Sequence, residues 1–168
     1  MKNILASKAI AIGVLLLSPI LSHSQNSLSA EISPSFNLAS LEGDYAVVNH
    51  YGANLALAIG SVHFDGAGNL LRGTYLLNRP TSTGTRELVN LTGRGSYIVN
   101  EDGTGIIVVE VTLPDGTIKT ATLDFVITRT AWIRGQTVAV EIEDEQREPS
   151  LVLGNGVFVT QTYTRRGE

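Results

Sequence analysis

The chain has 168 residues, 43% hydrophobic and 17% charged, with a formal net charge of −4 at pH 7. This length suits one domain, and because the chain has no cysteine, that domain must be held together by its hydrophobic core rather than by disulfides. A mildly acidic chain without a cluster of Lys and Arg is a poor candidate for binding nucleic acid or an anionic membrane surface.

The N-terminus, residues 1–24, has the features of an export signal. Lys2 and Lys8 form a basic start, an apolar run follows, and Ser22-His23-Ser24 places small residues two apart, as signal peptidase requires. The apolar run is shorter than the ~20 residues that span a bilayer, so a cleaved signal is favoured over a membrane anchor. We predict a mature chain that begins at Gln25, is not inserted in a membrane, and is periplasmic or extracellular.

The rest of the chain divides into a lead-in and a β-rich domain. Residues 25–40 are rich in Ser, Asn and Pro, which predicts a flexible segment. Residues 41–165 contain short alternating runs of Val, Thr and Ile between turn residues, which is typical of strands. The predicted strands cover residues 43–51, 55–64, 70–77, 86–99, 105–113, 117–128, 136–143 and 151–164. A single helical turn is predicted at residues 129–134.

Asp-Gly turns punctuate these strands. Residues 65–69, Asp-Gly-Ala-Gly-Asn, separate two apolar runs, and the pattern returns at residues 102–105 and 115–117. Gly and Asn take positive φ at little cost, so such clusters predict hairpin turns. A calcium loop of the EF-hand type would need oxygen ligands at alternate positions and a final Glu, which residues 65–69 lack. Turn chemistry explains these residues without a metal.

Consecutive strands joined by short turns form an antiparallel meander. Open sheet edges promote aggregation, and pairing of the first strand with the eighth would remove both edges. We therefore predict an all-β fold, a single closed antiparallel meander barrel of about eight strands (calycin-like), with a two-layer β-sandwich as the alternative. A barrel of this size has room for packed side chains or for one small ligand.

Four short motifs carry a resemblance to a known group of proteins. They are Gly43-Asp44-Tyr45, Phe64-Asp65-Gly66-Ala67-Gly68-Asn69, Gly95-Ser96-Tyr97 and Asp102-Gly103-Thr104-Gly105. Together they resemble the signature of an uncharacterised family of exported bacterial β-barrel proteins, although this family places two residues between Phe and Asp. The resemblance covers roughly residues 41–165 and implies a fold but no activity. The architecture is also similar to lipocalins and allene oxide cyclase barrels, but the lipocalin Gly-x-Trp motif is absent.

Polar residues give little sign of chemistry. A first hairpin that turns at Gly52-Ala53 would place His50 opposite Leu55 and His63 opposite Glu42, too far apart to share an ion. Glu110 and Asp124 interrupt apolar strands, but the alternation places both on the Thr-rich outer face. The sequence also lacks hydrolase, zinc-protease and nucleotide-binding motifs. We predict no catalytic residue, no metal site and no cofactor.

Aromatic residues are the candidates for lining an interior cavity, because Tyr and Trp combine apolar surface with a polar group. The six candidates for ligand binding are Tyr45, Tyr75, Tyr97, Phe125, Trp132 and Phe158. Ordinary core packing is the alternative interpretation of the same residues.

Three functions remain open. The leading hypothesis is non-catalytic binding of a small, largely apolar molecule in the barrel. The second is a cyclase or isomerase that acts on a hydrophobic substrate there, which would need an inward polar cluster. The third is a structural or cell-surface interaction module with a filled core. A cavity above roughly 300 Å³ would support the first two hypotheses, and a buried acid or His beside it would favour the enzyme.

Overall fold

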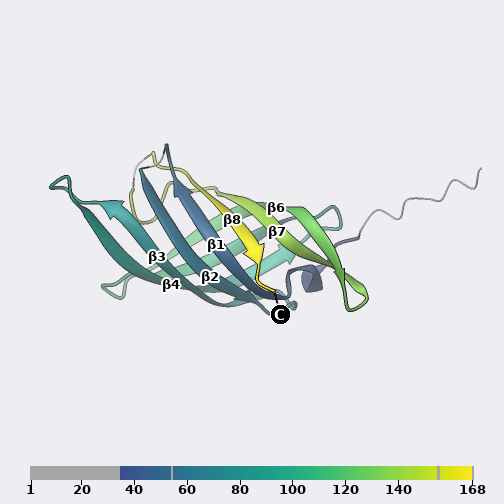
Figure 1. Cartoon of the computed structure of the whole chain (residues 1–168). Coiled ribbons are helices and arrows are strands. Elements are labelled where there is room, and N and C mark those ends of the chain that lie inside the picture. The colour runs from purple at the N-terminus through teal and green to yellow at the C-terminus, as the bar shows by residue number, and fades with distance from the viewer. Residues whose placement is uncertain (1–34, 54, 155, 168) are drawn as a thin grey trace, which may run out of the picture. The chain divides into compact units, whose positions relative to one another are not determined.

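The computed structural model describes residues 35–53, 55–154 and 156–167. Within them the chain is all-β apart from one 3₁₀ turn. In chain order the elements are η1 (Leu38–Leu41), β1 (Gly43–Tyr51), β2 (Ala56–Phe64), β3 (Asn69–Pro80), β4 (Arg86–Val99), β5 (Thr104–Thr112), β6 (Ile118–Ile133), β7 (Gln136–Gln146) and β8 (Val159–Arg165). Each strand pairs antiparallel with the next, and β8 pairs with β1 (Figure 1). The predicted closed meander barrel is confirmed, and the sandwich alternative is excluded.

The predicted export signal and most of the predicted lead-in, residues 25–34, lie outside the described residues. Residues 37–41, by contrast, are packed against the barrel. Asn37 caps η1 by accepting a hydrogen bond from Ala39 N, and Leu41 is fully buried. The Tyr97 hydroxyl donates to Leu38 O at 3.0 Å, which ties η1 to β4. This turn therefore closes the barrel end at which β1 begins.

The β6–β7 hairpin corrects the prediction of a helical turn at residues 129–134. β6 instead continues to Ile133, which pairs with Gln136. Arg134 and Gly135 both have positive φ, 50° and 84°, as the two central residues of a type I′ turn must. This turn matches the twist of the flanking strands, so the hairpin extends beyond the predicted end of the strand.

Two connections also differ from the prediction. Tyr51 pairs with Ala56, so the first hairpin loop is longer than expected. As a result His50 lies opposite Leu57, and His63 lies opposite Asp44. The eighth strand begins at Val159 instead of residue 151. The residues before it form a turn, in which backbone groups bond to one another and not to a neighbouring strand, as Ser150 N does to Val157 O at 2.7 Å.

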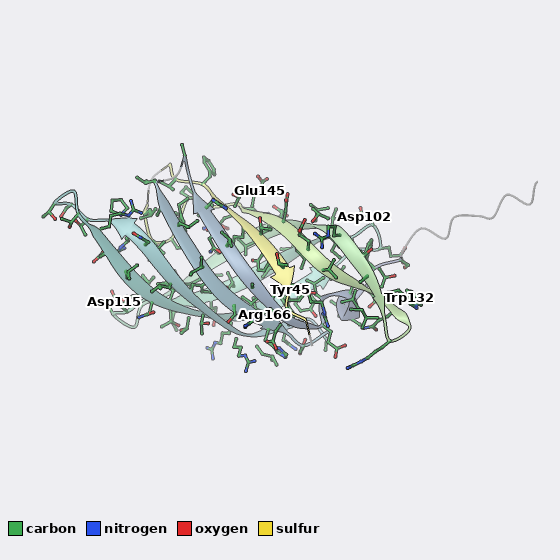
Figure 2. All side chains as sticks on the ribbon, viewed as in Figure 1. Tyr45, Asp102, Asp115, Trp132, Glu145 and Arg166 are labelled. Carbon is green, nitrogen blue, oxygen red and sulfur yellow. The ribbon has the colours of Figure 1, made fainter. Side chains whose placement is uncertain are left out.

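The Asp-Gly clusters form hairpin turns, as predicted, and their Asp side chains hold these turns together. The Asp65 carboxylate accepts hydrogen bonds from Ala67 N, Asn69 N and Asn69 Nδ2 at 2.6–2.9 Å. These bonds, chiefly those from Asn69, lower the pKa of Asp65. Asp102 and Asp115 accept in the same way from the backbone two residues later, at opposite barrel ends (Figure 2). The carboxylates thus complete turns.

Replacing Gly68 with Val should lower the melting temperature by a few degrees. Gly68 has φ of 101°, where a Cβ costs on the order of 1 kcal/mol. Ala67→Val, at a neighbouring residue without positive φ, is the control and should melt nearer the wild type. Thermal unfolding followed by circular dichroism measures both. A rise of several degrees in the wild-type melting temperature on adding calcium would show that the turn is a metal loop.

The barrel interior is formed by one face of every strand. The larger buried cluster lies toward η1 and includes Leu41, Tyr45, Phe64, Tyr97 and Phe125. Its rings pack edge to face, with 5.6 Å between the centroids of Tyr45 and Phe64 and 5.1 Å between those of Phe64 and Tyr97. A second buried cluster lies toward the opposite end and consists of Tyr51, Ala56, Ala58, Leu77, Val89, Leu91 and Val159.

Two glycines of β4, Gly93 and Gly95, lie at an irregularity of the sheet. The β3–β4 register shifts between Leu70 and Gly73, opposite Gly95 and Gly93. This bulge keeps both Leu70 and Gly73 on the inner face. The Tyr75 ring lies against Gly73 and Gly93, where any side chain would crowd it. The bulge and the glycines thereby make room for Tyr75 inside the barrel.

Candidate functional site

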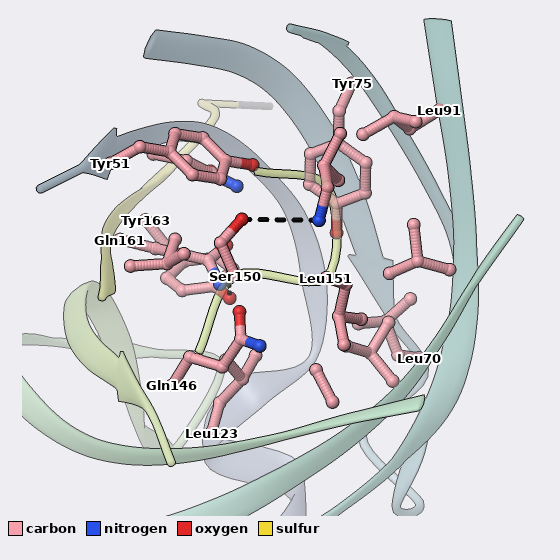
Figure 3. A pocket seen from close by; sticks show the side chains of 16 residues that line it. Tyr51, Leu70, Tyr75, Leu91, Leu123, Gln146, Ser150, Leu151, Gln161 and Tyr163 are labelled. Atoms are coloured by element: carbon pink, nitrogen blue, oxygen red, sulfur yellow. Dashed lines mark hydrogen bonds between the residues drawn. The ribbon is translucent and has the colours of Figure 1, made fainter. Parts of the chain in front are cut away.

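An interior cavity of about 40 Å³ lies between the two buried clusters (Figure 3). The strands contribute most of its lining, and the turn after β7 contributes the rest. The lining residues are Asn49, Tyr51, Leu70, Tyr75, Leu91, Val109, Val111, Ala121, Leu123, Gln146, Ser150, Leu151, Val152, Val159, Gln161 and Tyr163.

The cavity has two chemically different walls. The polar wall is formed by neighbouring strands β7, β8 and β1, which supply Gln146, Gln161, Tyr163, Asn49 and Tyr51. The apolar wall is formed by β3 to β6 and consists mainly of Leu70, Leu91, Val109, Val111, Ala121 and Leu123. Tyr75 stands on the apolar side as its polar exception (Figure 3). This arrangement suits a molecule with one polar and one apolar side.

A row of three buried polar side chains crosses β7, β8 and β1 at one level, and two of them, Asn49 and Gln161, line the cavity. Gln161 of β8 pairs with Asp144 of β7 on one side and with Asn49 of β1 on the other. We call Asp144, Gln161 and Asn49 the polar row. Each is only 6–7% exposed. Burial of polar groups is costly unless they are hydrogen-bonded, so the partners of this row decide what it can do.

The Tyr163 hydroxyl joins two members of the polar row. Its oxygen lies 2.7 Å from Asp144 Oδ2 and 3.2 Å from Gln161 Oε1. The hydroxyl has one proton and can donate it fully to only one of these two oxygens. If Asp144 is protonated, the Tyr163 hydroxyl can donate to Gln161 Oε1 and accept a hydrogen bond from Asp144. Burial raises the pKa of Asp144 to about 8, against the opposing effect of hydrogen bonds from Tyr163 and the Gln161 backbone. Burial also raises the pKa of Tyr163, and the charge of Asp144 adds to this effect. At pH 7 both groups are predominantly protonated.

Two oxygens of the polar row have no hydrogen-bond partner among the described residues. They are Asp144 Oδ1 and Asn49 Oδ1, one on each side of Gln161. The Asn49 side chain forms a hydrogen bond with Tyr51. Burial raises the pKa of Tyr51, and this hydrogen bond partly opposes the rise. Orphaned buried acceptors are rare in native proteins, and each calls for a water or ligand donor.

The cavity is closed on one side by Ser150–Leu153, which we call the capping segment. Ser150 Oγ accepts hydrogen bonds from Val152 N and Leu153 N, which folds the segment into a turn. Two side chains hold it to the strands, as the exposed Lys119 donates to Leu151 O at 2.7 Å and the partly buried Arg79 donates to Val152 O at 3.3 Å. The volume of about 40 Å³ is far below the ~300 Å³ of typical ligand pockets. In this closed form the interior can hold water or a small polar group but no larger molecule.

The six predicted aromatic residues are dispersed over the barrel. Tyr75 alone among them lines the cavity. Tyr45, Tyr97 and Phe125 are buried in the cluster toward η1, where Tyr45 donates to Ala139 O at 2.8 Å. Burial raises the pKa of Tyr97 to about 12. Trp132 and Phe158 are 74% and 62% exposed, and Trp132 projects outward from the β6–β7 hairpin (Figure 2).

The polar wall was not predicted from the sequence. In β8, Gln161 and Tyr163 alternate with Thr160, Thr162 and Thr164. This period of two could have predicted that Gln161 and Tyr163 face the interior. The same period, continued from Ile142, places Asp144 and Gln146 inward. The predicted seventh strand ended at residue 143 and therefore excluded both residues.

The polar residues considered in the sequence analysis lie on the outer face of the barrel, as the alternation predicted for Glu110 and Asp124. Glu110 faces outward and pairs with Arg94 at 3.2 Å, and Asp124 faces outward and pairs through both oxygens with Arg147 at 2.6 Å. His63 Nδ1 lies 3.0 Å from Asp44 Oδ1. Within the described ranges no group of three or more His, Asp or Glu side chains is placed to hold a metal ion.

Comparisons with known proteins yield no relative: no family model, no curated protein and no solved structure matches the chain. The resemblance to exported bacterial barrels and to lipocalins therefore stays a prediction. In the part of the chain that is described, no helix has the length and apolar character needed to cross a membrane.

Proposed function

We propose that this protein is an exported, non-catalytic barrel that binds a small amphipathic molecule between its polar and apolar walls. The observation that carries the proposal is the polar row, with two buried acceptor oxygens for which the described part of the chain supplies no partner. A core selected only for stability would gain from apolar residues at these positions. The largely apolar ligand expected from the sequence is thereby refined to one that also carries a polar group.

Entry of such a molecule requires the capping segment to move. The side-chain bonds that hold its carbonyls to β3 and β6 come from Arg79 and Lys119, which are partly or largely exposed. Bonds between exposed groups contribute little net stability, since water replaces either partner. Displacement of Leu151 and Val152, which line the small cavity, would enlarge it. Binding therefore requires the capping segment to move, but the strands of the barrel stay paired.

Native mass spectrometry of the protein purified from its host without detergent tests this function. The wild type should retain a small molecule, and Gln161→Leu should lose it because the centre of the polar row is removed. Thr162→Val changes the next residue of β8, which faces outward, and should retain the molecule. Circular dichroism should show that both variants remain folded. A wild type without added mass, both as purified and after incubation with a host extract, would instead support a filled structural barrel.

An enzymatic function is the second candidate, and Asp144 is the observation that favours it. A carboxylic acid that stays protonated near pH 7 can donate a proton to a bound substrate. A cyclase or isomerase would use Asp144 as the acid and the apolar wall to fold the substrate. Incubation of the retained molecule with fresh wild type and with Asp144→Asn separates the two functions. Conversion by the wild type alone would establish the enzyme.

A further inference from the structure

When Asp144 is ionised, the unpartnered groups of the polar row are all hydrogen-bond acceptors. Asp144 Oδ1 and Asn49 Oδ1 have no donor, and Gln161 Oε1 shares the single Tyr163 proton at 3.2 Å. The Asn49 amide group is already directed to Tyr51. What the site lacks is therefore a group with several donors, and an ammonium group has three and no acceptor.

Charge points in the same direction. Among the described residues Asp144 is the one buried ionisable carboxylate, and none of the buried residues is a Lys, Arg or His. The titratable groups that face Asp144 are the phenols of Tyr163 on β8 and Tyr75 on β3, and both remain neutral because burial raises their pKa values. Phe125, its neighbour on β6, has no charge. No described side chain can thus neutralise an ionised Asp144, whereas a cationic ligand can.

We propose that the interior site binds a small alkyl or aryl amine, with its ammonium group against Gln161 and Asn49, which line the cavity, and directed to Asp144, which the Tyr163 hydroxyl joins to the cavity wall. This inference rests on the proposed function and names its ligand class. The apolar part of the amine would lie against Leu70, Leu91 and Leu123 on the opposite wall. An ammonium group is small enough for the closed cavity, and a longer alkyl chain would displace the capping segment.

Amine binding should be linked to proton release. In the free protein Asp144 is mostly protonated at pH 7 and about half protonated at pH 8, while the ammonium complex needs the carboxylate. The affinity for an amine should therefore increase about fivefold from pH 7 to pH 8. About one proton per bound amine should pass to the buffer at pH 7. A neutral molecule of the same size would show neither effect.

Isothermal titration calorimetry of the full chain with n-hexylamine, 1-hexanol and hexanoate tests the proposal. The wild type should bind n-hexylamine most tightly, with the pH dependence given above. Asp144→Asn should weaken n-hexylamine binding more than about tenfold and abolish its pH dependence, because the charged partner is lost. Glu145→Gln, at the adjacent outward position of β7, should change neither. Asn49→Leu removes a second acceptor and should also weaken amine binding, which keeps the test valid if Asp144→Asn fails to fold.

Two results would overturn the amine assignment in different ways. Equal or tighter binding of 1-hexanol or hexanoate, unaffected by Asp144→Asn, would leave the ligand-binding barrel standing but reject a cationic ligand. Absence of binding by all three probes, with the wild type shown to be folded, would reject both the amine site and the proposed function.

Discussion

Replacing Asp144 with Asn is expected to stabilise the protein at pH 8 while leaving its stability at pH 4 nearly unchanged. Burial raises the pKa of Asp144 from the usual 3.8 to about 8. Through this group the folded state binds up to one more proton than the unfolded state between these values, so the contribution of Asp144 to wild-type stability falls as the pH rises from 4 to 8. At ~1.4 kcal/mol per pH unit, the loss is on the order of 5 kcal/mol. Asn cannot ionise, so the variant avoids this loss.

Urea unfolding at pH 4, 6 and 8 measures the effect. The difference between variant and wild type isolates Asp144, because the surface carboxylates with lowered pKa values, such as Asp65 and Asp124, are present in both proteins. Glu145→Gln on the outer face is the matched control and should follow the wild-type pH dependence. If Asp144→Asn and the wild type lose stability in parallel across this range, Asp144 is ionised in the folded protein.

Phe125→Ala should be the most damaging single truncation in β6. Its ring is 4% exposed, belongs to the main buried cluster and fills the space left by Gly105 on β5. Removal of a large buried ring costs about 3–5 kcal/mol, because apolar contacts are lost and a cavity remains. Asp124→Ala, one residue earlier, removes an exposed ion pair with Arg147 and should cost much less. One denaturant series at constant pH compares them, and a larger loss for Asp124→Ala would contradict the observed strand orientation.

The fold could be predicted because its signals are local. Alternation in β6 correctly placed Leu123 and Phe125 inside and Asp124 outside. Asp-Gly turns and strand spacing together predicted a meander, and the cost of open edges predicted its closure. The strand ends were less predictable. The type I′ turn at Arg134-Gly135 depends on pairing with β7, since an Arg with positive φ is not a usual turn residue.

The site was harder to predict because its polar residues look like surface residues. Glu143 and Glu145 are outward, and Asp144 between them is buried. An acidic run resembles a solvated strand end, and only the register from Ile142 separates the inner carboxylate from the outer ones. Aromatic character was a poor guide because Tyr45 and Tyr97 serve packing near η1. The closed volume depends on the turn before β8, which no local pattern indicated.

The five tyrosines provide the most direct test of where a ligand binds. Tyr51, Tyr75 and Tyr163 line the cavity, whereas Tyr45 and Tyr97 lie in the cluster toward η1. NMR of the full chain labelled with ¹³C at tyrosine Cζ, titrated with n-hexylamine or with the molecule retained from the host, follows all five together. Binding between the polar and apolar walls predicts shifts for Tyr51, Tyr75 and Tyr163 and little change for Tyr45 and Tyr97. Shifts confined to Tyr45 and Tyr97, or no shifts at saturating ligand, would contradict an interior binding site at the polar row.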